Sequence, residues 1–261
     1  MRRRIILIAA AVAVLALALV ALLVLVPRGD SDPPVAAAPT VAAGELTPQE
    51  STVVVTPRAD GTVAIEQKLI FDAGTGLDAP VTWYVGGTQL GWQSSAREIR
   101  YGVTPKVLEF GAREINATGA PTDLTTTVIE NQDARDPFFH GHRYRLAGPG
   151  PWSAGRHAVM INIVLSDSWV EIEGVSAVVL PLRFVAGPGS GQPLDLVRLT
   201  VRGASTLECP ATNINFSERQ PCGRAGTLTL HPDELDQVEA VVVPDVSAIT
   251  AAPIPVTERR T

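Results

Sequence analysis

An apolar run near the N-terminus, Ile5–Val26, constrains this chain more than any other feature. The run is about 22 residues long and holds no charged side chain, so a helix rising about 1.5 Å per residue would extend roughly 33 Å, enough to cross a bilayer core. Arg2–Arg4 precede it, and basic residues favour the cytoplasmic side. We therefore expect residues 1–4 to form a cytoplasmic stub, residues 5–26 a single transmembrane signal anchor, and the rest to be extracytoplasmic.

A cleaved signal peptide is the alternative. Such signals carry an apolar run of about 7–15 residues and then a cleavage site made of small residues. Val35–Ala38 and Val41–Ala43 fit a site of this kind, but both lie well past the apolar run, and Pro39 follows the first. The length of the run favours an uncleaved anchor, whereas cleavage would make the protein secreted.

Residues 27–50 have the composition of a linker, with five prolines among alanine, aspartate and serine. Proline favours an extended polyproline II conformation of about 3.1 Å per residue, so the linker could hold a folded body up to roughly 70 Å from the membrane.

The charge balance excludes one class of partner. The formal net charge is -6, and Arg2–Arg4 lie outside the folded body, which is therefore more acidic than the whole chain. With no basic stripe in the sequence, nucleic acid is not an expected partner. The two lysines, Lys68 and Lys106, stand against many arginines, alanines and valines, a bias typical of GC-rich coding, as in actinobacteria.

After residue 51 the pattern changes to short strands. Asp60–Gly61 is a turn signal, and from Thr62 to Asp72 apolar side chains alternate with polar ones, with Gln67 interrupting the apolar face. This period of two predicts a half-buried antiparallel strand. Further strands are predicted at 52–56, 81–85, 98–103, 107–110, 124–129, 142–146, 157–165, 169–172, 175–185, 194–201, 227–230 and 238–243.

Many short strands without long helical patterns are typical of an all-β fold. We predict an antiparallel β-sandwich over residues 51–245, either one large sandwich or two small ones, preceded by the transmembrane helix. Residues 246–261 contain two prolines and several polar residues, and a disordered tail is expected there.

Cys209 and Cys222 are the two cysteines of the chain, and both lie beyond the apolar run. In an exported chain, an even number of closely spaced cysteines most often forms a disulfide. No further cysteine or histidine flanks the pair at zinc spacing, and the C-x-x-C redox pattern is absent. A structural disulfide is the preferred interpretation.

His140 and His142 are the densest candidate metal feature. Two histidines at i and i+2 on a strand point to one face and could share a metal, and Asp133 and Asp136 lie just upstream. Two histidines do not complete a site, so ordinary surface or hydrogen-bonded histidines are favoured.

No catalytic or cofactor-binding residues are predicted. Gly187–Gly191 is rich in glycine, but Pro188 occupies the first glycine position of G-x-S-x-G, and an inter-strand loop is the better interpretation. The sequence contains no phosphate-binding loop, dinucleotide fingerprint or EF-hand loop.

The four tryptophans allow a binding hypothesis. Exposed aromatic rings on a β-sandwich could stack on sugars, although tryptophans in strands are more often core residues. Trp92 and Trp152, among glycine, proline and serine, are the pair more expected to be exposed.

The sequence also resembles a known family. Asp60–Phe71 resembles the opening hairpin of the DUF2207 family of predicted bacterial membrane proteins, and Gly141–Leu146 is similar to its later H-x-Y-x-apolar segment. The loop from Cys209 to Cys222 resembles the paired-cysteine loop of that family. The resemblance covers residues 52–245 and implies a fold and an extracytoplasmic location; it implies no activity and no functional residues.

These features together predict a membrane-anchored extracytoplasmic β-sandwich, without enzymatic activity or a cofactor, that acts in binding or assembly in the bacterial cell envelope. Its expected partners are the bilayer, through residues 5–26, and an envelope protein or glycan. An extracytoplasmic enzyme, metal-dependent through His140 and His142, and a glycan-binding module are the alternatives.

Overall fold

The computed structural model describes residues 48–73, 81–85, 88–94, 97–115, 120–130, 142–148, 150–181, 196–210, 219–231, 234, 238, 240–244, 246–256 and 259–260. Of these, the side chains of 81–100, 129–130, 142–143 and 259–260 are not described. Within these ranges no helix has the length and apolar character needed to cross a bilayer. The predicted anchor, Ile5–Val26, lies outside them.

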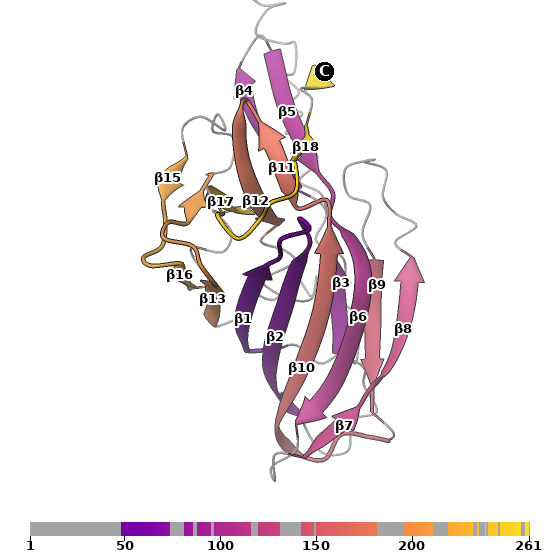
Figure 1. Ribbon diagram of the computed structural model, residues 1–261. Coiled ribbons are helices and arrows are strands. Elements are labelled where there is room, and N and C mark those ends of the chain that lie inside the picture. Colours follow the sequence, from indigo (N-terminus) through magenta and orange to yellow (C-terminus); the bar gives the residue numbers. More distant parts are fainter. Residues whose placement is uncertain are drawn as a thin grey trace, which may run out of the picture. The chain divides into compact units, whose positions relative to one another are not determined.

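The described part of the chain is almost entirely β-strand, arranged in four sheets, which confirms the predicted all-β class (Figure 1). The largest sheet has seven strands in the order β16-β13-β1-β2-β10-β6-β7. Its strands are β1 (Glu50–Pro57), β2 (Val63–Ala73), β6 (Lys106–Ile115), β7 (Pro121–Asp123), β10 (Gly155–Ser166), β13 (Leu196–Val201) and β16 (Thr227–Leu230).

The β1–β2 hairpin forms as its sequence predicts. At the turn, the N–H and hydroxyl of Thr62 both donate to the Asp60 carboxylate, and these bonds lower the pKa of Asp60 from its ordinary value. Gly61 follows with a φ of 84°, a left-handed conformation that favours glycine. Along β2 alternate residues are buried, so one face of the strand lies in the core and the other meets solvent.

Gln67, the polar interruption on the buried face of β2, is itself fully buried. Its Nε2 donates to Ser51 Oγ of β1 over 2.6 Å, so two buried polar side chains on neighbouring strands pair inside the sheet. This contact lowers the cost of placing the glutamine amide nitrogen on an apolar face, because a buried polar group costs less once it is hydrogen-bonded.

The second sheet has six strands in the order β15-β14-β17-β12-β11-β18. They are β11 (Trp169–Ile172), β12 (Val175–Pro181), β14 (Glu208–Cys209), β15 (Gln220–Pro221), β17 (Ala240–Pro244) and β18 (Ile254–Pro255). The chain passes from β10 of the first sheet to β11 of the second through Asp167 and Ser168. Asp167, at a φ of 62°, pairs with Lys106 Nζ over 2.8 Å.

Residues of the two large sheets share one hydrophobic core. Val178 and Leu180 of β12 and Val241 and Val243 of β17 belong to the same cluster as Ile65, Val159 and other inward residues of the seven-stranded sheet. The intervening residues of β12 and β17 are also buried, in a second cluster with Tyr101 and Val103. Burial on both faces explains the continuous apolar runs of these two strands.

Two smaller sheets complete the described chain. One has the order β3-β9-β8, with β3 (Val81–Val85), β8 (Thr125–Glu130) and β9 (His142–Ala147); the other has the order β19-β5-β4, with β4 (Thr88–Ser94), β5 (Arg97–Val103) and β19 (Arg259–Arg260). The Tyr144 ring of β9 stacks on Phe110 of β6, with ring centroids 3.8 Å apart, and so joins the first small sheet to the core.

The buried Tyr144 provides a test of this packing at high pH. Burial raises the pKa of its phenol above the ordinary value of about 10. A raised pKa stabilises the fold below the unfolded pKa, and that contribution is lost as pH rises through the folded pKa. We expect the free energy of unfolding, measured by urea denaturation between pH 9 and 11, to fall less steeply in Tyr144→Phe than in the wild type; equal slopes would contradict this.

The segment after Pro244 corrects one expectation. It was expected to be a disordered tail at 246–261, but Val246 and Ile249 are buried in the core, and β18 and β19 pair with β11 and β5. The disorder prediction is therefore wrong for the described residues of this segment, because its apolar side chains have a core to fill.

Two further expectations need correction. Trp152 is 5% exposed and packs edge-on against Phe71, so the favoured core interpretation is confirmed for it and the exposed alternative is wrong. The side chain of Trp92 lies outside the described residues. Pairing is also not antiparallel throughout, because β1–β13 and β11–β18 are parallel. In both parallel pairs the two strands are distant in sequence, which gives the chain room to return in the same direction.

Candidate functional site

The structure does not test the histidine pair suggested by the sequence. His140 lies outside the described residues, and His142 begins β9, where its backbone pairs with Val85 and Glu130 while its side chain is not described. Among the described residues, no group of three or more histidine, cysteine, aspartate or glutamate side chains is disposed to hold a metal ion. A site at His140 and His142 therefore remains a hypothesis.

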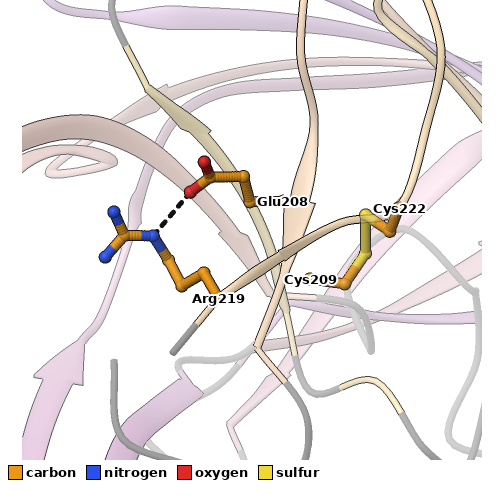
Figure 2. Close-up of a disulfide and its surroundings, with 4 residues drawn as sticks. All are labelled: Glu208, Cys209, Arg219 and Cys222. Carbon is orange, nitrogen blue, oxygen red and sulfur yellow. Dashed lines mark hydrogen bonds and ion pairs between the residues drawn. A yellow bond between two sulfur atoms is a disulfide. The ribbon is translucent and has the colours of Figure 1, made fainter. Parts of the chain in front are cut away.

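The cysteines form the expected disulfide. Cys209, at the end of β14, is joined to Cys222, just after β15, and their Cα atoms lie 5.6 Å apart (Figure 2). Both residues are half-buried and pack against the main core. The Cys222 N–H also donates to the carbonyl of the fully buried Leu207, over 2.9 Å, so the bridge lies at the margin of the core.

An ion pair links the same two segments on the other side. Arg219 Nε donates to Glu208 Oε2 over 2.6 Å, and the two side chains are 13% and 20% exposed. Because Glu208 and Cys209 are consecutive strand residues, their side chains point to opposite faces, as Figure 2 shows. A covalent link on one face and a charged link on the other therefore hold β14 and β15 together at the edge of the six-stranded sheet.

A buried histidine is the most chemically distinctive group among the described residues. His157 of β10 is 8% exposed, and its ring stacks on Phe71 of β2 at a centroid distance of 5.5 Å. Trp152 meets the same ring edge-on at 5.2 Å. Two aromatic side chains thus fix the plane of the imidazole.

Both ring nitrogens of His157 face oxygen atoms. Nε2 lies 2.8 Å from the Ser153 carbonyl, which can only accept, so Nε2 carries a hydrogen. Nδ1 lies 2.6 Å from Glu114 Oε1 of β6. One proton is therefore shared across this contact: either an imidazolium donates to the carboxylate, or a carboxylic acid donates to a neutral ring.

This arrangement leaves neither ring nitrogen of His157 free to act on a substrate. In a catalytic histidine–carboxylate pair, the carboxylate orients one ring nitrogen while the other faces the reacting group. Here the second nitrogen, Nε2, is occupied by the Ser153 carbonyl, one face of the ring stacks on Phe71, and Trp152 packs against the ring in an edge-on arrangement. The geometry therefore indicates a structural pair that ties β6, β10 and the segment before β10 together.

The sequence does contain a signal for a buried His157. Val159, Ile161 and Ile163 define the buried face of β10, and His157 has the same parity. A histidine on the buried face of a strand requires a partner for each ring nitrogen. The sequence does not identify Glu114 as the partner of His157. That pairing depends on the register between β10 and β6, in which Glu114 lies opposite Val159.

Comparison with known proteins leaves the family open. No family model matches the chain, and no curated protein matches it. An M1 zinc metallopeptidase from Deinococcus radiodurans is similar at 16% identity and a TM-score of 0.34, over 77% of this chain and 42% of that one. An aminopeptidase N family protein from Idiomarina loihiensis is similar at 12% identity and a TM-score of 0.39, over 74% of this chain and 29% of that one.

A third solved structure, a putative protease from Parabacteroides distasonis ATCC 8503, is similar at 11% identity and a TM-score of 0.34, over 78% of this chain and 41% of that one. The chain thus spans less than half the length of each of these three proteins. Similarity at this level carries no argument about activity.

Proposed function

We propose that this protein is a membrane-tethered, extracytoplasmic β-sandwich that acts as a binding or assembly module of the bacterial cell envelope, and not as an enzyme. The observation that carries the proposal is the Cys209–Cys222 disulfide, in a chain that begins with arginines and an apolar run long enough to span a bilayer. Disulfides persist in oxidising compartments, so the bridge favours the outer side of the membrane.

The sandwich is supported by the common core of the two large sheets. Inward residues of β2 and β10 belong to one cluster with Val178, Leu180 and Val241 of the six-stranded sheet. Two sheets that bury facing side chains in one core are the elements of a sandwich. The resemblance to the DUF2207 family implies the same location and supplies no activity.

Cysteine accessibility in intact cells tests the location. Leu108 of β6 is 57% exposed, and the described residues include no free cysteine, so Leu108→Cys introduces a reactive thiol. We expect a membrane-impermeant maleimide to label this variant without lysis, and the protein to stay with membranes washed in alkaline carbonate. Arg4→Cys, in the expected cytoplasmic stub, is the matched control and should label only after permeabilisation. Labelling of Leu108→Cys only after lysis would contradict the proposal.

Metal content tests the non-enzymatic part of the proposal. The purified chain is expected to carry no stoichiometric zinc. Zinc bound at one equivalent, and lost when His140→Ala and His142→Ala are combined, would instead support a metal-dependent enzyme.

A further inference from the structure

The C-terminal segment is firmly held as far as Ala251. The backbone N–H groups of Thr250 and Ala251 both donate to the Ala59 carbonyl over 3.0 Å, beside the β1–β2 turn. Trp169 Nε1 donates to the Ala251 carbonyl, also over 3.0 Å. With Val246 and Ile249 buried, the chain is anchored to the core up to this point.

Beyond this anchor, the residues Ala252–Val256, which we term the C-terminal arm, are held by fewer contacts. In the arm, β18 lies parallel to β11 in only two residue pairs, Val170 with Ile254 and Glu171 with Pro255. The Val256 N–H donates to the Glu171 carbonyl over 2.9 Å, and Ile254 remains 45% exposed. Releasing the arm also ends the packing of Val256 against the second core cluster and the two β19–β5 residue pairs that follow it. Because a backbone hydrogen bond contributes about 0.5–1.5 kcal/mol net, these contacts together cost less to break than the whole fold.

The two prolines of the arm determine which side of β18 can donate backbone hydrogen bonds. In a strand, the N–H groups of alternate residues point to the same side. Since the Val256 N–H faces β11, the Ile254 N–H faces it too, and positions 253 and 255 face away. Both of these positions are proline, so the outer edge of β18 presents no N–H at either position. The arm therefore fits an edge strand of β11 that stops the sheet from growing further.

We propose that the edge of β11 covered by β18 is a strand-accepting surface, and that it also accepts the C-terminal arm of a second copy of this chain, exchanged reciprocally. The arm already fits this edge in side-chain parity and hydrogen bonding, so the same segment from another copy fits it identically. Exchange of an identical element is a low-cost route to a dimer. The outward prolines prevent a further strand from adding to the sheet, and reciprocal exchange closes at two copies.

Strand exchange would give the assembly role proposed above a physical basis. Its significance in the cell rests on that proposed function, but the exchange itself does not. The experiments use purified protein in detergent, and they report nothing on location. A failure here would leave the cysteine-labelling result intact, and a cytoplasmic location would leave these experiments unchanged.

Binding of the arm in trans is the first test. A chain ending at Ala252 keeps the Trp169 contact but frees the edge of β11, and the probe is a synthetic peptide of residues 251–261. We expect this truncated chain to bind the peptide at least tenfold more tightly than the full chain, whose own arm competes at high effective concentration. A peptide carrying Ile254→Asp and Val256→Asp should not bind. Equal affinity of the two chains, or no binding to a truncated chain that retains its circular dichroism spectrum, would overturn the proposal.

Exchange between complete chains is the second test and avoids truncation. Glu171 and Pro255 lie directly opposite one another and are both exposed, so Glu171→Cys in one chain and Pro255→Cys in another should form an interchain disulfide when mixed. Glu171→Cys mixed with Leu108→Cys is the matched control and should crosslink at least tenfold less. A single chain that carries both Glu171→Cys and Pro255→Cys tests the β11–β18 register, because the two thiols can form an internal disulfide only if these positions lie opposite one another. If that chain crosslinks internally but the mixture gives no heterodimer above the control, exchange between copies is refuted.

Discussion

Replacing Glu114 with alanine is expected to lower the free energy of unfolding by about 2–4 kcal/mol, because it removes one partner of a largely buried pair. His157 is 8% exposed, and the Glu114 side chain is 20% exposed. Without the carboxylate, Nδ1 of the ring loses its hydrogen-bond partner in a site lined by Phe71 and Trp152. Urea denaturation of the purified chain, followed by tryptophan fluorescence, measures the loss.

Two variants make this prediction specific. Glu114→Gln keeps a side chain that can donate from its amide to Nδ1 of a neutral ring, so we expect a loss of about 1 kcal/mol. Arg156→Ala breaks the neighbouring pair with Glu50, whose side chains are 59% and 33% exposed, and should cost at most about 1 kcal/mol. A Glu114→Ala variant as stable as Arg156→Ala would show that the buried pair contributes no more than a surface one.

The sequence predicts strands most reliably where one face of the strand meets solvent and the other is buried. In β2 the alternation of apolar and polar residues identified both the strand and its buried side. In β12 and β17 continuous apolar runs predict the strands but not their burial on both faces, since a run without alternation does not say which layers cover it. The two-residue strands β14, β15, β18 and β19 are too short to have a period at all.

The candidate groups were harder to predict because they depend on register. Glu114 and His157 are 43 residues apart, and only the pairing of β6 with β10 brings them together.

Composition also predicted the wrong environment for two segments whose tertiary contacts decide the outcome. Prolines after Pro244 suggested disorder, yet Pro255 pairs with β11, because at a sheet edge a proline needs no outward N–H. Glycine, proline and serine around Trp152 suggested exposure, although the ring fills the core beside Phe71.

Removing the disulfide is the second change expected to have a large effect. The bridge joins residues 13 apart in sequence, and closing a loop of about 15 residues stabilises a fold by roughly 3 kcal/mol in the chain-entropy model. We expect the combined variant Cys209→Ala, Cys222→Ala to lose about this amount. For a domain of this size, the melting temperature should fall by roughly 6–12 °C, measured by differential scanning calorimetry.

The denaturant dependence of unfolding separates the two possible origins of that loss. If the bridge acts mainly by restricting the unfolded chain, its removal lets that chain expand and expose more surface, so the slope of unfolding free energy against urea should increase. If the half-buried sulfurs act mainly by packing against the core, the midpoint should fall while the slope stays constant. Arg219→Ala, which breaks the ion pair on the opposite face of β14 but leaves the loop closed, should not change the slope. A double-alanine variant with an unchanged midpoint would mean that the ion pair and the core contacts hold β14 and β15 without the bridge.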